Sequence, residues 1–222
     1  NGAAFSEHAL KEGYNLSYLE KTGLTIVNSS RNFDRFRGRV LFPIHSLSGR
    51  ILGFGGRILK NNAKEAKYLN SPESDIYSKS KVLYGLFFSK NSIVKKDRCL
   101  LVEGYTDVVS MHQSGIENVV ASSGTSLTVE QIKLIKRFTN NITLLFDGDA
   151  AGIKAALRGV NLILQEGMNV KVLTFPAGED PDSYAKKVSS EDFENYITKQ
   201  SKDFIEFKCS LLLEEAKEDP IK

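Results

Sequence analysis

The sequence has few cysteines, no long apolar run and little net charge. Its 222 residues include only Cys99 and Cys209, which are far apart and have no CxxC or Cys/His companions, so neither a disulfide framework nor a zinc site is indicated. No stretch approaches the roughly 18 apolar residues that cross a bilayer, and the first residues lack a basic-then-apolar signal pattern. We therefore expect a protein of a reducing cytoplasm that does not enter a membrane.

The formal net charge of +3 is low for a protein that coats nucleic acid through its overall charge. Basic residues nevertheless greatly outnumber acidic ones between residues 31 and 81, so any contact with nucleic acid is expected there. The hydrophobic content of 41% and charged content of 26% are typical of a globular protein of one large or two smaller domains. Because the chain begins without Met and ends in a charged stretch, we expect a piece of a longer protein.

The pattern of apolar residues changes near residues 90–97. Before this point, apolar runs at 40–44 and 50–54, separated by Ser48-Gly49, predict an antiparallel hairpin. Beyond it, short apolar runs alternate with helical stretches, which predicts βαβ units and a mainly parallel sheet flanked by helices. The predicted strands are 99–102, 118–121, 142–146 and 170–175; the predicted helices are 105–113, 128–138, 150–165 and an amphipathic stretch at 190–217.

Acidic residues follow the predicted strands. Glu103 comes directly after the first strand, and Asp147 and Asp149 come directly after the third. Because the carboxyl ends of parallel strands meet at one edge of a sheet, these side chains are expected to lie together. Clustered carboxylates repel one another unless a cation neutralises them, and Mg²⁺ prefers carboxylate oxygens. The pattern predicts a divalent-metal site for phosphate chemistry, in which Glu103 serves as a ligand or as a general base. Further acids near this edge are Asp107, Asp180 and Asp182.

A simpler interpretation exists for each acidic motif taken alone. Asp and Gly dominate turns, so the DGD at 147–149 is compatible with a plain turn at a strand end. Glu103-Gly104 is compatible with the start of a helix whose dipole favours an acid. The coincidence of both motifs at one predicted sheet edge, followed by a third acidic turn, favours the metal site.

These residues carry a resemblance to a known family. The segments VEGYTDVV, ASSGTSLT, LLFDGDAAGIKAALR and GEDPD resemble the TOPRIM domain shared by bacterial primases, topoisomerases and some nucleases. Upstream, FDRFRGRVLFPI, GRILGFGGR and KYLNSPES resemble the amino-terminal subdomain of the DnaG-type primase core, and the likeness is contiguous over about 32–187. The resemblance implies an α/β fold with a basic α+β subdomain at 1–96, a TOPRIM-like mainly parallel sheet at 97–187 and a truncated C-terminal helical segment at 188–222.

The resemblance also implies roles for individual residues. Glu103, Asp147 and Asp149 match the family's catalytic metal-binding acids, and Asp107, Asp180 and Asp182 match additional metal-binding acids. Arg35 and Arg37 match residues that bind nucleotide phosphates. The residues that match nucleic-acid contacts are Arg57, Lys67, Tyr68, Asn70, Lys79 and Lys81. Lys81 stands where Arg is common, which keeps the charge but loses bidentate geometry. The alternative for any one of these basic residues is a solvated hairpin face.

The activity implied is synthesis of short RNA primers from nucleoside triphosphates on single-stranded DNA, with Mg²⁺ or Mn²⁺, by a monomer among the replication proteins of the bacterial nucleoid. Zinc and the replicative helicase would be bound by separate modules that are not recognisable in this chain. Two alternatives remain, a TOPRIM nuclease or topoisomerase fragment and a nucleotide-sensing binding module. A topoisomerase would need a nucleophilic tyrosine, and for Tyr105 we expect packing instead. We also expect Phe33, Phe36, Phe42 and Phe54 to belong to a core.

Overall fold

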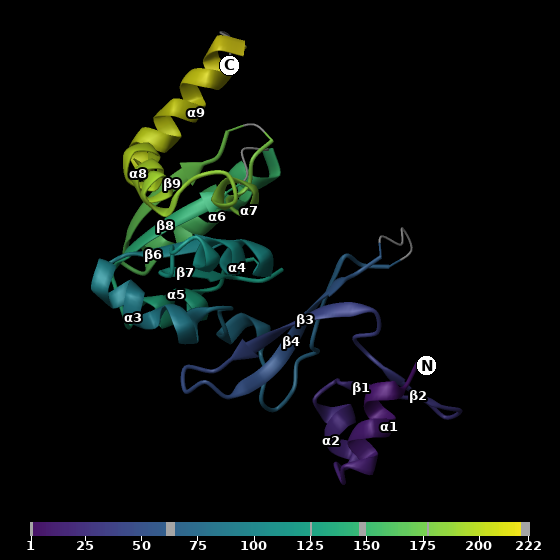
Figure 1. The fold of residues 1–222 in the computed structure, drawn as a ribbon. Helices are drawn as coiled ribbons and strands as arrows, with labels where there is room; N and C mark the ends of the chain where they lie inside the picture. Colours follow the sequence, from purple (N-terminus) through teal and green to yellow (C-terminus); the bar gives the residue numbers. More distant parts are fainter. Residues whose placement is uncertain (1, 61–64, 125, 147–149, 177, 219–222) are drawn as a thin grey trace. The chain divides into compact units, whose positions relative to one another are not determined.

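A computed structural model describes residues 2–60, 65–124, 126–146, 150–176 and 178–218 (Figure 1). Contacts between residues divide the chain into unit 1, Asn1–Val82, and unit 2, Leu83–Lys222. This division falls before the change in sequence pattern near residue 97. The reason is helix α3 (Leu86–Lys96), which packs against strand β7 (Val119–Ala121) of unit 2. Each unit is described by itself.

Unit 1 begins with two short helices and a small hairpin. These elements are α1 (Ala4–Lys11), α2 (Leu16–Lys21), β1 (Thr25–Val27) and β2 (Asn32–Asp34), and the two strands pair antiparallel. The residue before α1 provides no capping side chain. Asp34 serves as the cap instead, because its carboxylate accepts hydrogen bonds from the backbone N–H groups of Phe5 at 2.8 Å and Ser6 at 2.9 Å. The hairpin therefore closes the start of the first helix.

The second part of unit 1 is an antiparallel sheet in the order β3 (Arg39–His45), β4 (Ile51–Ile58), β5 (Tyr68–Asn70). The first two strands confirm the predicted hairpin, and a bulge interrupts their register between Ile44 and His45. Strand β5 was not foreseen from the sequence. Gly56 is required where it stands, because a Cβ atom there would lie 2.7 Å from the ring of Phe36.

Unit 2 contains the predicted parallel sheet. Within the described residues it has five strands in the order β10-β9-β8-β6-β7. The strands are β6 (Cys99–Val102), β7 (Val119–Ala121), β8 (Asn141–Phe146), β9 (Asn169–Thr174) and β10 (Lys202–Asp203). The pairs β6–β7, β6–β8 and β8–β9 are parallel, which confirms the βαβ interpretation, whereas β10 is antiparallel to β9.

Helices α4 (Tyr105–Gln113), α5 (Val129–Lys136) and α6 (Ala150–Gln165) match the predicted ones closely. The predicted stretch at 190–217 corresponds to α8 (Ser190–Gln200) and α9 (Phe204–Glu218), whereas α3 and the short helix α7 (Pro181–Ala185) were not predicted. Thr128 and Gln131 form the expected capping box at the start of α5. The prediction of a helical stretch at 190–217 is corrected in one respect. Strand β10 separates α8 from α9, because Lys202 and Asp203 pair with the edge strand β9.

The core of unit 2 lies between the sheet and helices α4, α7 and α8. Leu100, Leu145 and Leu173, from three parallel strands, join Met111 of α4 and Phe193 of α8 in one buried cluster. Side chains alternate between the two faces of a strand, and α6 packs against β8 and β9 with residues outside that cluster. Helices therefore cover both faces of the sheet (Figure 1). Among the described residues, no helix has the length and apolar character needed to cross a bilayer.

Candidate metal and nucleic-acid sites

The predicted acidic edge begins at the end of β6. Glu103 follows that strand directly, and its side chain is exposed. Strand β8 runs parallel to β6 with Leu101 opposite Leu144 and ends at Phe146, so both strands end at the same edge of the sheet. Asp147 and Asp149 lie outside the described residues. The structure therefore places one of the three predicted catalytic acids and the strand that leads to the other two.

The backbone around Glu103 is held on both sides. Its carbonyl oxygen accepts a hydrogen bond from the N–H of Ser123 at 3.0 Å, and the following N–H, of Gly104, donates to the carboxylate of Asp107 at 2.9 Å. Ser123 has a φ of 59°, which is uncommon for a residue other than glycine. Asp107 thus fixes the first turn of α4 directly beside Glu103, a role that the sequence interpretation did not include.

The other two predicted acids belong to α7, which packs against α4. Asp180 caps α7, because its carboxylate accepts a hydrogen bond from the N–H of Ser183 at 2.6 Å. Asp182 accepts hydrogen bonds from the hydroxyl of Ser110 in α4 and from the ammonium of Lys186 at 2.8 Å. Within the described part of the chain, no three His, Cys, Asp or Glu side chains are grouped closely enough to hold a metal. Metal ligation by these residues stays a prediction.

Tyr105, next to the acids, has the packing role that we expected. Its side chain is 2% exposed and its ring meets that of Tyr84 edge to face at 4.8 Å. A nucleophile must reach its substrate, and this hydroxyl lies on a ring enclosed by the core of unit 2. Tyr105 is therefore a poor candidate for the covalent step of a topoisomerase.

The two arginines predicted to bind nucleotide phosphates differ in their contacts. Arg35 is half-buried and donates from Nε and Nη2 to the carbonyl oxygen of Asn70, at 3.3 and 3.2 Å. Burial lowers the pKa of the Arg35 guanidinium from its usual value. Arg37 is exposed, and its guanidinium carbon lies 5.2 Å from the centre of the Phe33 ring. Arg35 thus joins β5 to the rest of unit 1, whereas Arg37 faces solvent.

The four phenylalanines expected in a core are only half-buried. Phe36 and Phe54 pack edge to face with ring centres 6.2 Å apart, which agrees with a packing role. The ring of Phe33 also contacts the guanidinium groups of Arg31, at 4.6 Å, and of Arg37, at 5.2 Å.

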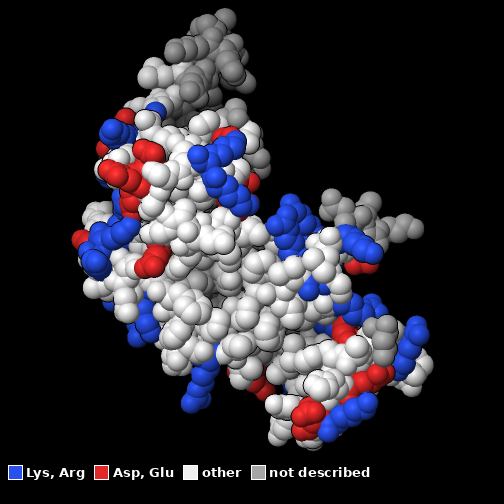
Figure 2. All heavy atoms as spheres, viewed as in Figure 1, with Lys and Arg blue, Asp and Glu red and all other residues white. Residues whose placement is uncertain are grey.

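Three of the predicted nucleic-acid contacts lie together, on β4, on β5 and directly before β5. Arg57 in β4 is paired with Tyr68 in β5, and its guanidinium lies 5.8 Å from the tyrosine ring. The ammonium of Lys67 lies 5.9 Å from the same ring. Asn70 ends the strand, whereas Lys79 and Lys81 lie further along the chain in a short 3-10 helix. Basic side chains are visible over this part of unit 1 in Figure 2.

Arg39 supports this basic group and was not singled out from the sequence. Its side chain is 6% exposed, pairs with Glu65 at 3.7 Å and donates to the carbonyl oxygens of Ala66 at 2.9 Å and Lys67 at 3.4 Å. Arg39 therefore anchors the backbone at Lys67 to β3. No local sequence pattern marks it as an inward-facing cation, because Arg39 precedes a continuous apolar run in β3.

Comparison with known proteins supports both units. Residues 1–90 match the family described as the N-terminal domain of the DNA primase catalytic core, and residues 100–185 match a Toprim-like family. The DNA primase of Staphylococcus aureus is 42% identical over 207 residues, which cover 92% of this chain and 34% of that protein. The chain thus spans about a third of the length of the curated relatives it matches.

Solved structures agree with the sequence matches. The E. coli primase catalytic core is 39% identical with a TM-score of 0.86, covering 97% of this chain and 69% of that one. A DnaG primase catalytic domain bound to single-stranded DNA is 40% identical with a TM-score of 0.83, covering 94% and 69%. The combination of a primase-type N-terminal unit with a Toprim-like unit defines the class, that of primase catalytic cores. The chain belongs to the bacterial DnaG-type primase family.

Proposed function

We propose that this chain is the catalytic core of a DNA primase, which joins ribonucleoside triphosphates into short RNA primers on a single-stranded DNA template during DNA replication. The observation that carries the proposal is the position of Glu103. An exposed carboxylate at the carboxyl end of a parallel strand, in a Toprim-like unit that follows a basic primase-type unit, suits metal-dependent nucleotidyl transfer.

The proposed cofactor is Mg²⁺, with Mn²⁺ as a substitute, held by Glu103, Asp147 and Asp149. The donor chemistry fits, since these are hard oxygen ligands and the Glu103 side chain is exposed. When bound, the ion supplies activation of the attacking hydroxyl and neutralises charge on the leaving phosphates. The additional acids Asp107, Asp180 and Asp182 lie on α4 and α7 and complete the proposed acidic edge, beside their hydrogen-bonding roles. Zinc is not expected in this part of the protein.

The proposed partners of unit 1 are nucleotides and nucleic-acid strands. Arg37, with Arg35 behind it, suits the triphosphate of an incoming nucleotide. The template and RNA product suit a surface that combines cations with an aromatic ring, because bases stack on rings while phosphates pair with Lys and Arg. That surface consists of Arg57, Lys67, Tyr68, Asn70, Lys79 and Lys81. The bound strand of the related DnaG catalytic domain supports a single-stranded DNA partner.

The setting of the proposed reaction is the bacterial replication machinery in the cytoplasm, with the chain acting as a monomer. Recruitment by the replicative helicase would use a separate module. A TOPRIM nuclease or topoisomerase is less well supported, since Tyr105 is enclosed and unit 1 matches primase cores.

The test is primer synthesis by the purified chain. Single-stranded template, labelled nucleotides and Mg²⁺ or Mn²⁺ should yield short RNA with the original sequence and none with Asp147→Ala or Asp149→Ala. Glu130→Ala is the matched control, because Glu130 is an exposed acid on α5 and should tolerate the change. Equal synthesis by all variants would remove the acids from the mechanism. Metal-dependent DNA cleavage without nucleotide incorporation would support a nuclease instead.

A further inference from the structure

The two carboxylate oxygens of Asp182 have partners of different kinds. Oδ1 accepts a hydrogen bond from the hydroxyl of Ser110, which is 8% exposed on α4. Oδ2 accepts one from the ammonium of Lys186, one helical turn later in the chain, whose side chain is 62% exposed. The Asp182 side chain itself is 23% exposed. One oxygen is thus held from the protein interior and the other by a cation at the surface.

This asymmetry makes only one of the two contacts easy to exchange. The Ser110 hydroxyl is buried at the α4–α7 contact, so breaking its hydrogen bond leaves a polar group without water. The Lys186 ammonium is mostly in solvent, and an exposed ion pair of this kind contributes little. A divalent ion that uses Asp182 as a ligand therefore competes with Lys186 for Oδ2, whereas Oδ1 stays fixed.

We propose that Lys186 is a built-in counter-ion of Asp182 that a divalent metal displaces, and that Ser110 is the positioning residue that aims the carboxylate. This inference rests on the proposed function, because it assigns to Asp182 a place in the same metal site. It adds the residues that set the metal affinity. Lys186 lowers that affinity in proportion to the strength of its ion pair, and Ser110 raises it by removing rotational freedom from the ligand.

The neighbouring lysine provides a matched control. Lys187 is 61% exposed and forms an ion pair with Glu179, which precedes α7. Replacing either lysine with methionine removes one positive charge from nearly the same place. Only Lys186→Met removes the contact with Asp182. A difference between the two variants therefore reports the contact rather than the local charge.

The experiment is a titration of the purified chain with Mn²⁺, in which electron paramagnetic resonance measures the free ion. Lys186→Met should lower the Kd for Mn²⁺ roughly two- to fivefold, the factor that an exposed ion pair carries. Lys187→Met should change it by a clearly smaller factor. Ser110→Ala should raise the Kd by roughly tenfold, as expected for loss of a hydrogen bond to a charged group. Thermal unfolding of each variant checks that the fold is kept.

Several outcomes would overturn the inference. If Lys186→Met and Lys187→Met lower the Kd equally, the effect is one of general charge and Lys186 has no special part. If Lys186→Met raises the Kd, the lysine supports metal binding rather than competing with it. The proposed function fails separately, when the original chain and Asp149→Ala bind Mn²⁺ equally well. If Asp149→Ala no longer binds Mn²⁺ while the two lysine variants have the same Kd, the metal site is supported and only this inference is wrong.

Discussion

The two units of the chain are stabilised in different ways. Most of the fully buried apolar side chains belong to unit 2, where the parallel sheet and its helices enclose a continuous core. Among the described residues of unit 1, the buried apolar side chains are Ala9, Leu19, Ile44 and Tyr77, and of these only Ile44 is fully buried. Polar contacts contribute to the stability of unit 1 as well. They include the Asp34 cap of α1 and the hydrogen bonds from Arg35 and Arg39 to backbone carbonyl oxygens.

The difference shows in which unit functional side chains can be distinguished from those that stabilise the fold. In unit 2 the apolar core fixes the strands, and the exposed side chain of Glu103 at the strand end is suited to chemistry. In unit 1 arginines serve both structural and functional purposes. Some arginines hold the backbone together and others face solvent, so a basic residue there cannot be assigned to nucleic acid from its charge alone.

The largest expected effect compares one phenylalanine in each unit. Phe193 is 0% exposed in the unit 2 core, and Phe193→Ala should cost about 3–5 kcal/mol of unfolding free energy. Phe36 is half-buried, and Phe36→Ala should cost roughly half as much, because less of its ring is removed from water. Native-state hydrogen exchange measures each unit through its own amides. An equal cost for the two variants would show that unit 1 depends on apolar packing after all.

The contrast between the apolar core of unit 2 and the polar contacts of unit 1 also determines how much of the fold could be predicted from the sequence. The four parallel strands, the helices α4, α5 and α6 and the capping box of unit 2 were predictable, because burial gives strands and helices characteristic periods of apolar residues. The position of Glu103 after β6 followed from that pattern and from the rule for parallel strands. The resemblance to primases supplied the roles of the acids, which remain predictions.

What could not be predicted depends on contacts between distant residues. The cap of α1 comes from Asp34, 28 or more residues away, and β5 is too short to show a pattern. Strand β10 has two polar residues that acquire their conformation only by pairing with β9. The partners of Asp182 follow from the packing of α7 on α4, and no local signal identifies Ser110.

A smaller effect separates the two roles of arginine in unit 1. Arg35→Ala should lower the unfolding free energy of unit 1 by about 1–3 kcal/mol, because the carbonyl oxygen of Asn70 loses a charged donor. Arg37→Ala should leave stability nearly unchanged and weaken nucleotide binding, since its guanidinium is exposed beside Phe33. Urea unfolding and calorimetric titration with a nucleoside triphosphate measure the two quantities. If Arg37→Ala destabilises unit 1 as much as Arg35→Ala does, the division of roles is wrong.

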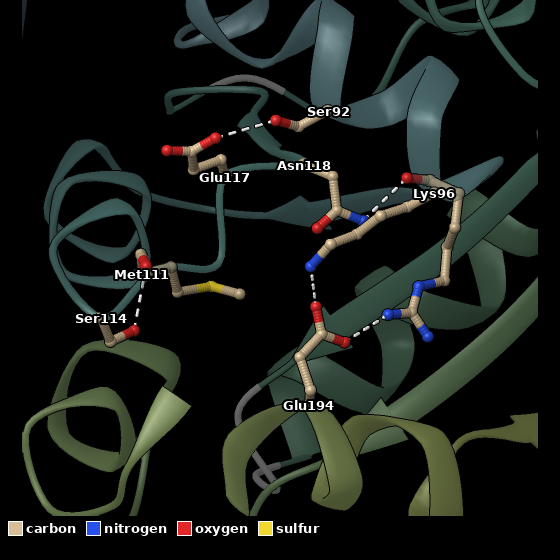
Figure 3. Close-up of polar contacts among 8 residues, drawn as sticks. Ser92, Lys96, Met111, Ser114, Glu117, Asn118 and Glu194 are labelled. Atoms are coloured by element: carbon tan, nitrogen blue, oxygen red, sulfur yellow. Dashed lines mark hydrogen bonds and ion pairs between the residues drawn. The ribbon is translucent and has the colours of Figure 1, made fainter. Parts of the chain in front are cut away.

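The smallest expected effect concerns a polar contact of unit 2. Figure 3 shows the carboxylate of Glu194, on α8, beside Lys96 at the end of α3. Glu194 also accepts a hydrogen bond from Arg98 at 2.6 Å. Burial by itself would raise the pKa of Glu194, but the hydrogen bond from Lys96 and the positive charges of Arg98 and Lys96 together lower it from its usual value of 4.5.

A lowered pKa means that the folded state favours the ionised carboxylate. The stabilisation by Glu194 is therefore complete above its unfolded pKa near 4.5 and is lost as the pH falls through the lower folded value. Glu194→Gln should cost about 1 kcal/mol or less near pH 7, with the difference from the original chain vanishing in acid. Urea unfolding from about pH 7 to about pH 3 measures it. Glu191→Gln, an exposed change on the same helix, is the control, and a pH-independent cost of Glu194→Gln would show that the ion pairs do not stabilise α8.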